Sequence, residues 1–275
     1  MARTWLITGS SRGFGRKLAE AVLASGDSLV ATARTPEQLA DLVKAYPDQA
    51  RAVALDVTDA GQARAAVKTA VTEFGRLDVV VNNAGYANVS AIEDTSDEDF
   101  RAQIEANLWG TINVSQAALT AMRPQGAGHI IQFSSIGGRV GGTPGIAPYQ
   151  TAKFGVEGFS RVLANEVGPL GIKVTIVEPG SFRTDWAGSS MQIADIAEDY
   201  QSTLGMIVKY RQDRAGNEPG DPAKAAQVLL KVADLAEPPL QLLLGKDAVS
   251  YARAELERQA AEVDKFAELS ESTDY

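Results

Sequence analysis

The chain has 275 residues, an apolar fraction of 45% and a formal net charge of −9. This length suits one α/β domain or two small ones, and the apolar fraction excludes wholesale disorder. The acidic balance has the wrong sign for general nucleic-acid binding, and no apolar run is long enough to cross a bilayer. The N-terminal stretch lacks the apolar core and cleavage site of a signal peptide, so a cytoplasmic protein is expected.

Cysteine is absent and histidine occurs only at position 129. These counts exclude disulfides, thiolate nucleophiles and cysteine-based metal sites, and they leave no histidine cluster. No metal site is predicted. His129 falls on a predicted strand, where we expect a structural role.

Short apolar or β-branched runs alternate with longer stretches of helical periodicity. This alternation predicts a doubly wound parallel α/β sheet of the Rossmann type, with about seven strands and helices on both faces. The predicted strands are Thr4–Thr8, Ser28–Ala33, Arg51–Leu55, Asp78–Asn82, His129–Ser134, Lys173–Glu178 and Leu240–Leu244. The predicted helices are 14–25, Pro36–Ala45, Ala60–Phe74, Asp97–Met122, Pro148–Val167, Pro222–Leu235 and Tyr251–Leu269. Residues 1–250 are expected to form one domain, and 251–275 a C-terminal helix with a loose tail from Ser270.

Residues 180–220 break the alternation, with short apolar clusters in polar surroundings and no strand pattern. A stretch this long between periodic elements is usually functional or mobile. We expect about 181–220 to be a mobile lid in which Trp186 and Met191 wall an apolar substrate pocket. Packing in an ordinary core is the alternative.

A glycine-rich turn, Thr8-Gly9-Ser10-Ser11-Arg12-Gly13-Phe14-Gly15, joins the first predicted strand to the first predicted helix. Glycines there let the backbone approach a pyrophosphate, which rests on the helix N-terminus. A turn without a ligand is the alternative, which the placement between strand and helix disfavours. The Gly-x3-Gly-x-Gly spacing differs from the Gly-x-Gly-x-x-Gly of ordinary dinucleotide folds.

Tyr149 and Lys153 stand four residues apart on a predicted helix, so their side chains share one face. A fixed positive charge beside a phenol lowers its pKa and makes it a usable proton donor and acceptor. Such a pair is also common on solvated helices. The Tyr149–Lys153 pair is informative because the glycine turn, Asn82-Asn83-Ala84-Gly85 and Ser134-Ser135 occur upstream of it.

The glycine turn, Asn82-Asn83-Ala84-Gly85 and Tyr149-x3-Lys153 together resemble the one-domain branch of the short-chain dehydrogenase/reductase family. The resemblance covers Thr4 to about Leu244. It implies an oxidoreductase that interconverts a ketone or aldehyde with an alcohol by hydride transfer. A same-fold epimerase or dehydratase is one alternative, for which little chain remains after Leu244. A non-catalytic dinucleotide sensor or scaffold is another, which would be expected to lose catalytic residues.

The resemblance assigns four catalytic residues. Tyr149 would donate or accept the proton, Ser135 would fix the substrate oxygen, and Lys153 would lower the Tyr149 pKa and bind the nicotinamide ribose. Asn107 would support a water-linked proton relay to the lysine. Ser134 competes with Ser135 for this role, and Ser135 is preferred because the family uses the second of such a pair. Ser135 precedes Tyr149 by fourteen residues, one more than the commonest spacing.

The end of the second predicted strand bears on the choice of cofactor. It carries Arg34 and no carboxylate, and Arg12 lies in the glycine turn. Two guanidiniums suit a ribose 2′-phosphate, so NADP(H) is predicted; two solvated surface arginines are the alternative. With the contacts that the resemblance implies, the predicted cofactor residues are Gly9, Ser11, Arg12, Gly13, Phe14, Gly15, Arg34, Asp56, Val57, Asn83, Ala84, Gly85, Tyr149, Lys153, Pro179, Gly180 and Thr184.

The predicted partners are small molecules and copies of the same chain. The substrate is expected to be a largely apolar carbonyl compound or alcohol, without nucleic acid or membrane. By resemblance, a homodimer or homotetramer would form through the helices at Asp97–Met122 and Pro148–Val167.

Overall fold

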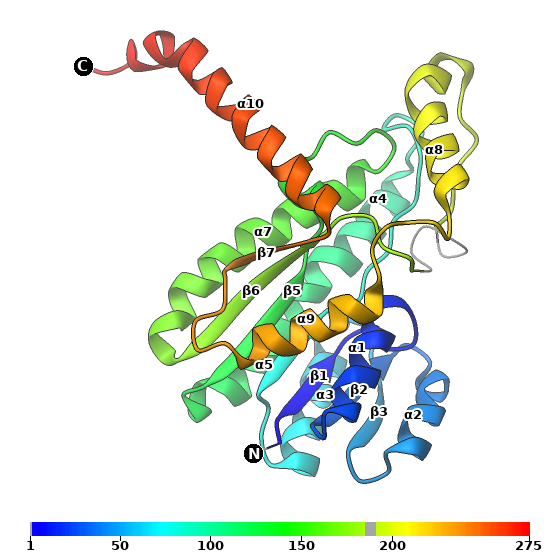
Figure 1. The fold of residues 1–275 in the computed structure, drawn as a ribbon, viewed down its shortest axis with the longest axis vertical. Coiled ribbons are helices and arrows are strands. Elements are labelled where there is room, and N and C mark those ends of the chain that lie inside the picture. The colour runs from blue at the N-terminus through cyan, green and yellow to red at the C-terminus, as the bar shows by residue number, and fades with distance from the viewer. Residues whose placement is uncertain (1, 185–190) are drawn as a thin grey trace.

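A seven-stranded parallel sheet forms the centre of the computed structural model, which describes residues 2–184 and 191–275 (Figure 1). The strand order is β3-β2-β1-β4-β5-β6-β7. The strands are β1 (Thr4–Ile7), β2 (Ser28–Ala33), β3 (Ala50–Ala54), β4 (Val79–Asn82), β5 (Gly128–Phe133), β6 (Ile172–Pro179) and β7 (Gln241–Leu244). The predicted doubly wound sheet is confirmed, and every predicted strand boundary lies within one residue of the observed one.

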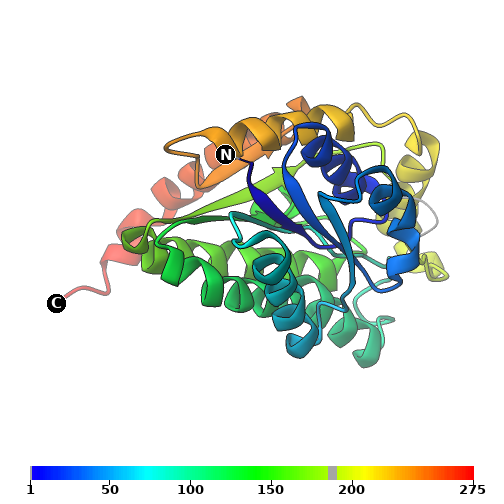
Figure 2. The same ribbon diagram turned by 90° about the horizontal axis from the view of Figure 1, so that it is seen from below.

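Helices cover both faces of the sheet (Figure 2). One face is covered by α1 (Gly13–Ala24), α2 (Ala40–Ala45) and α9 (Pro222–Asp234), the other by α3 (Ala60–Phe74), α5 (Gly110–Gln125) and α7 (Ala147–Val167). Trp5 and Ile7 of β1 enter the first core and Leu6 enters the second, because successive strand side chains point to opposite faces. Strands buried on both faces read as the unbroken apolar runs seen in the sequence.

The chain reverses its winding direction between β1 and β4. β1 is followed along the chain by β2 on one side, whereas β4 is followed by β5 on the other. The loops after β1 and β4 therefore diverge and open a crevice at the carboxyl edge of the sheet. That edge holds the glycine turn and the Asn82-Asn83-Ala84-Gly85 motif, so both predicted cofactor motifs lie where such folds bind ligands.

The predicted helix at Asp97–Met122 is interrupted. It consists of α4 (Asp97–Ile104), a π-helical turn η2 (Glu105–Trp109) and α5. Likewise, Pro36–Ala45 starts as a 3-10 helix, η1 (Pro36–Leu39), before α2 begins. Single π turns inside helices are frequent at functional sites, and this one carries Asn107.

The sequence carries no periodic signal for residues 198–214, yet these residues are helical. They form η5 (Glu198–Tyr200), a π turn η6 (Gln201–Gly205) and α8 (Met206–Arg214). In α8 only Val208 is buried, so the sequence carries no amphipathic period that would reveal the helix. Long-range packing, rather than local pattern, fixes this helix.

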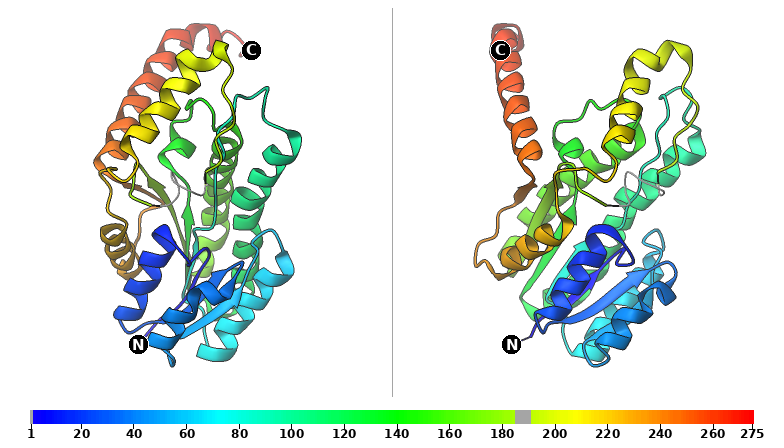
Figure 3. Two further views of the ribbon diagram at one scale, coloured as in Figure 1. Left: turned by 90° about the vertical axis from the view of Figure 1, so that its right-hand side faces the viewer. Right: turned by 45° about the vertical axis from the view of Figure 1, so that its right-hand side comes forward.

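The C-terminal helix α10 (Lys246–Glu271) is longer than predicted and includes two residues of the expected tail. It projects from the same end of the molecule as α8 (Figure 3). The remaining short elements are α6 (Ile136–Arg139) and η3 (Gly168–Leu170). None of the helices described here is long and apolar enough to cross a membrane.

Candidate active site

Glycines shape the turn between β1 and α1. Gly9 has a φ of +67°, which side chains rarely adopt. A Cβ at Gly15 would overlap the Gly9 carbonyl oxygen, so only glycine lets the helix pass this close to the turn. Arg12, the N-cap residue of α1, makes no side-chain cap hydrogen bond. The first amides of α1 therefore remain available to an anion.

Thr8 ties this turn to the loop after β4. Its Oγ1 accepts hydrogen bonds from the backbone N–H groups of Asn83 and Ala84, both at 2.9 Å. The Asn83 Nδ2 donates in return to the carbonyl oxygens of Thr8 at 2.9 Å and Gly9 at 3.2 Å. These bonds, here called the Thr8–Asn83 brace, hold two predicted motifs together across the crevice.

Phe14 is a packing residue at the start of α1. Its ring lies 5.4 Å from that of Phe133 and 4.9 Å from that of Phe182, measured between centroids. The side chain therefore contributes to the core, and only its backbone faces the turn with the half-buried Ser11 and Gly13.

Arg12 and Arg34 are exposed and follow the neighbouring strands β1 and β2. In the described part of the chain neither side chain forms a hydrogen bond or an ion pair. Arg16 differs, because it pairs with Asp41 and Glu20, and the Asp41 contact raises its pKa above the ordinary value. Arg16 thus stabilises the fold, whereas Arg12 and Arg34 remain available to a charged ligand.

Asp56 and Val57 follow β3 at the same edge. The Asp56 Oδ1 accepts bonds from the Thr58 backbone N–H at 3.0 Å and from the Thr58 hydroxyl at 2.8 Å. Among the residues described, Oδ2 makes no such bond. Val57 is buried, and a Cβ at Gly110 would overlap it. Asp56 is therefore held in place with one oxygen available.

Tyr149, Lys153 and Ser135 meet beyond the end of β5. Tyr149 and Lys153 are both buried on α7, and the Lys153 Nζ lies 5.5 Å from the Tyr149 ring centroid. That ammonium also donates to the Phe133 carbonyl oxygen at 2.6 Å. Ser135, the N-cap residue of α6, hydrogen-bonds Tyr149. The three predicted side chains therefore form one cluster.

Ser134 faces elsewhere. Its Oγ lies 3.5 Å from the carbonyl oxygen of Lys153, to which it donates, and the side chain is buried. Of the two serines that the sequence leaves open, Ser135 is therefore the one that meets the Tyr149 side chain.

Burial is the largest influence on the pKa values of Tyr149 and Lys153. It raises the pKa of Tyr149 to about 12, although the Ser135 hydrogen bond and the charge of Arg211 lower it. It lowers the pKa of Lys153 to about 8, against the opposing charge of Glu157. The expectation that Lys153 brings the Tyr149 pKa down is therefore wrong for the protein's own groups, because desolvation of the phenolate outweighs the nearby charges.

Asn107 is fully buried in the π turn. Its Nδ2 donates to the carbonyl oxygens of Tyr86 at 2.9 Å and Gln103 at 2.8 Å, and its Oδ1 accepts from the Tyr86 N–H at 3.1 Å. A Cβ at Gly85 would overlap that Oδ1 and lie 3.7 Å from the Lys153 Nζ. Glycine at this position therefore lets the asparagine and the lysine approach the same point.

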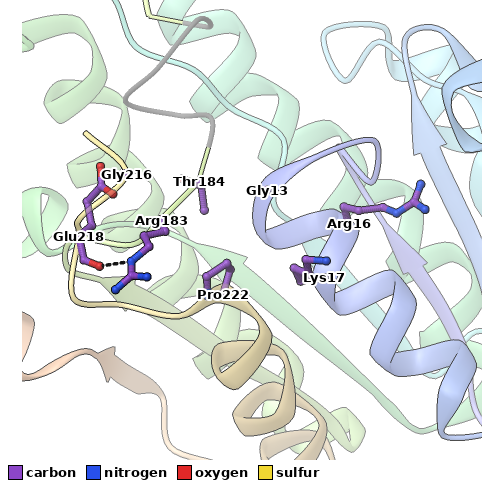
Figure 4. A pocket seen from close by; sticks show the side chains of 8 residues that line it. All are labelled: Gly13, Arg16, Lys17, Arg183, Thr184, Gly216, Glu218 and Pro222. Carbon is purple, nitrogen blue, oxygen red and sulfur yellow. Dashed lines mark hydrogen bonds between the residues drawn. The ribbon is translucent and has the colours of Figure 1, made fainter. Parts of the chain in front are cut away.

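The loop after β6 faces the glycine turn. β6 ends at Pro179, and the Gly180 N–H donates to the Leu244 carbonyl oxygen at 2.9 Å. A Cβ at Gly13 would lie 3.6 Å from the Thr184 Cβ. Between them lies a cavity of about 320 Å³, lined by Gly13, Arg16, Lys17, Arg183, Thr184, Gly216, Glu218 and Pro222 (Figure 4). The predicted residues on both loops thus border one cavity beside the phosphate turn.

Tyr149 also belongs to a separate apolar cluster, here called the apolar chamber. Its other buried members are Ala87, Val89, Ile146, Met191 and Val208. Met191 agrees with the predicted substrate wall, and Trp186 lies outside the described residues. The sequence did not reveal Val89, Ile146 or Val208, which come from separate segments and share no local pattern.

His129 lies apart from the cluster, buried in β5, with its Nε2 2.9 Å from the Thr175 Oγ1. Burial lowers its pKa to about 4. Within the described residues, no group of three or more His, Cys, Asp or Glu side chains could hold a metal ion.

Comparison with known proteins decides the family. Residues 3–193 match the family model described as short chain dehydrogenase. The chain belongs to the short-chain dehydrogenase family. The resemblance predicted from the sequence is thereby confirmed. This short-chain dehydrogenase is also 52% identical over 271 residues to Oxidoreductase BOA17 of Botryotinia fuckeliana, covering 98% of each chain.

Solved structures of this family share the fold. A short-chain dehydrogenase from Streptomyces avermitilis has a TM-score of 0.93 at 39% identity, covering 100% of both chains. ElxO with NADP bound has a TM-score of 0.75 at 27% identity, over 91% of this chain and 100% of that one. A Burkholderia phymatum enzyme in complex with NAD has a TM-score of 0.81 at 20% identity, over 94% and 95%. Both nicotinamide dinucleotides therefore occur among proteins of this fold.

Proposed function

We propose that this short-chain dehydrogenase uses NADP(H) to interconvert a ketone or aldehyde with an alcohol, and that Tyr149 transfers the proton. One observation carries the proposal. The buried Tyr149 is hydrogen-bonded by Ser135 and lies one helical turn from Lys153. This cluster stands at the same edge of the sheet as the glycine turn, where a dinucleotide would present its reactive end.

The residues of the crevice fit a dinucleotide. The unpaired N–H groups at the start of α1 suit a pyrophosphate. The Thr8–Asn83 brace holds the loop after β4 beside that turn, and the Asp56 Oδ2 can accept a hydrogen bond from an amino group. When bound, NADP(H) supplies or accepts a hydride at the substrate carbon. In this proposal it is held by Gly9, Ser11, Arg12, Gly13, Phe14, Gly15, Arg34, Asp56, Val57, Asn83, Ala84, Gly85, Tyr149, Lys153, Pro179, Gly180 and Thr184.

Each member of the cluster has one task. Ser135 orients the substrate oxygen through its hydroxyl. Tyr149 keeps its proton at neutral pH, because its pKa is about 12, and it can therefore donate to a developing alkoxide. Lys153 supplies a buried positive charge and bonds the ribose. Asn107, which approaches Lys153 across Gly85, supports the return of a proton from water.

The two surface arginines favour NADP(H) over NAD(H). Arg34 stands at the end of β2, where NAD-preferring folds place a carboxylate, and Arg12 stands in the glycine turn. Neither has a charged partner among the residues described, so both can engage a 2′-phosphate through paired donors.

The same proposal covers the lid and the assembly. Residues 191–220 would close over the substrate, since Met191 and Val208 lie in the apolar chamber. A homodimer or homotetramer in the cytoplasm would bury the exposed apolar side chains on η2 and α7. These are Trp109, Phe154 and Val162, which are 48%, 47% and 58% exposed.

A carbonyl panel tests the proposal. The purified protein is mixed with ketones and aldehydes and with either NADPH or NADH, and the reduced-nicotinamide absorbance is followed. We expect turnover with NADPH for some members and slower turnover with NADH. If NADPH binds but no carbonyl is reduced and no alcohol is oxidised, the protein is a dinucleotide sensor and the proposal is wrong.

A further inference from the structure

One cation points to the substrate class. Arg211 lies on α8, five residues after the start of that helix. Its Nη1 is 3.8 Å from the Sδ of Met191, a buried member of the apolar chamber. The guanidinium also lies close enough to the buried Tyr149 for its charge to influence the phenol. Arg211 therefore faces the candidate active site rather than solvent.

Among the residues that the structure describes, Arg211 has no carboxylate partner. Among residues 2–184 and 191–275 its only hydrogen bond goes to the Met191 thioether, a weak acceptor. Other partly buried arginines behave differently. Arg139 pairs with the buried Glu178 at 3.0 Å, and Arg3 pairs with Asp27 at 3.3 Å. A desolvated cation without a partner is costly, so its retention here calls for an anion that the described chain does not supply.

The surroundings limit what that anion can be. The side chains packed with Tyr149 are apolar and include Val89, Ile146 and Val208. Arg211 is the only basic residue that affects the pKa of Tyr149 in the described structure. One guanidinium suits a single planar anion bound through two parallel hydrogen bonds, whereas a phosphorylated ligand usually meets several cations.

We propose that the natural substrate is an oxo acid, or the matching hydroxy acid, whose carboxylate binds Arg211. Its carbonyl would lie at Tyr149 and Ser135, and an apolar section would cross the chamber between the two ends. This inference rests on the proposed function. It refines the expected substrate from a largely apolar carbonyl compound to one that also carries a carboxylate.

Matched substrate pairs test the inference. 3-, 4- and 5-Oxo acids are compared with their methyl esters, because each ester replaces the carboxylate charge by one methyl group and keeps the rest of the chain. For the preferred chain length we expect wild type to favour the acid. Arg211→Met should lower kcat/KM for that acid about 10- to 150-fold, the range for a hydrogen bond to a charged group. The ester should change by less than about threefold, and Arg211→Lys should restore part of the activity with the acid.

Arg214→Met is the matched control. Arg214 is exposed at the end of the same helix, where its guanidinium stacks 4.5 Å from the Tyr210 ring centroid. Its removal should leave both substrates unchanged. Equal losses for acid and ester in Arg211→Met would show that Arg211 only positions the lid, and a wild-type preference for the esters would also overturn the inference.

A binding measurement separates this inference from the proposed function. Calorimetry of the NADPH-loaded protein with 4-phenylbutanoate, and with 4-phenylbutanamide, does not depend on turnover. We expect the acid to bind more tightly in wild type and to lose that advantage in Arg211→Met. Equal binding of acid and amide contradicts the carboxylate site, even if carbonyls are reduced. Tight acid binding without reduction of any carbonyl contradicts the proposed function instead.

Discussion

The two sides of the crevice are built in different ways. On the cofactor side, the turn after β1 and the loop after β4 are joined by the backbone and side-chain bonds of the Thr8–Asn83 brace. On the substrate side, the apolar chamber is assembled from four separate stretches of chain, held by packing and by the short bridge between Val89 and Ile193. The cofactor side is therefore formed by short sequence motifs, whereas the substrate side depends on contacts between residues far apart in the sequence.

This difference fits what each side must do. A dinucleotide presents the same phosphates and riboses to every enzyme that uses it, so fixed hydrogen bonds serve it well. Substrates differ from enzyme to enzyme. Apolar side chains on α8 and in the segment before it, such as Val208 and Met191, can be substituted without disturbing the sheet. Tyr149 belongs to both sides, since it bonds Ser135 at the sheet edge and packs in the chamber.

The largest expected effect is at that shared residue. Tyr149→Phe removes the transferable proton but keeps the ring and its packing, and general acid catalysis typically contributes about 10²–10⁴ in rate. We expect kcat to fall by that factor while NADPH affinity, measured by fluorescence titration, stays near wild type. Retention of more than about a tenth of kcat with chemistry rate-limiting would rule out the proton-transfer role.

Breaking the Thr8–Asn83 brace should weaken the cofactor side. Thr8→Val leaves the N–H groups of Asn83 and Ala84 without their acceptor, and an unsatisfied buried donor costs about 1–3 kcal/mol. We expect the free energy of unfolding to fall by about 2–4 kcal/mol and NADPH binding to weaken. Thr8→Ser keeps the hydroxyl and serves as the control. Urea midpoints that coincide for the two variants would show that the brace contributes nothing.

Cofactor choice should move with Arg34. Arg34→Asp removes a guanidinium from the 2′-phosphate and adds a carboxylate that can accept a bond from the free 2′-hydroxyl of NADH. The ratio of kcat/KM for NADPH over NADH should fall by about 10- to 150-fold, and less at high salt because the site is exposed. Arg16→Met, which removes an arginine already paired with Asp41, should leave the ratio unchanged. A wild-type preference for NADH, or an unaltered ratio in Arg34→Asp, contradicts the assignment.

A smaller effect tests the sheet that supports both sides. Burial lowers the pKa of His129 to about 4 from an ordinary 6.5, so the unfolded chain binds more protons between these values. Stability should therefore fall as pH drops through this window, by about 2 kcal/mol at pH 5. His129→Gln keeps an amide near the Thr175 hydroxyl and removes the titration. If wild type and variant lose equal stability between pH 7 and pH 5, His129 is not buried as described.

The sequence predicted the cofactor side in detail. Short apolar or β-branched runs marked every strand, and the glycine turn was predicted from the glycines that its tight backbone requires, such as Gly9 and Gly15. The resemblance favoured Ser135 over Ser134, and the path of the chain into α6 brings Ser135 to Tyr149. The sequence also did not predict that the pKa of Tyr149 is raised, because the direction of the shift depends on how completely the fold buries the phenol.

The substrate side was largely hidden from the sequence. Residues Met206–Arg214 carry no amphipathic period, so α8 was missed, and with it the position of Arg211. A lone arginine in a polar stretch looks like a solvated one. Its importance follows only from the packing of Val208 and Met191 in the apolar chamber.

Isotope transfer tests the central claim most directly. The protein is incubated with a ketone and NADPH in which both C4 hydrogens are replaced by deuterium, and the alcohol is examined by mass spectrometry. The account predicts deuterium on the carbinol carbon of the alcohol formed by wild type, and almost no alcohol from Tyr149→Phe. An alcohol without deuterium would show that the hydride does not come from NADPH, and would contradict the proposed reaction.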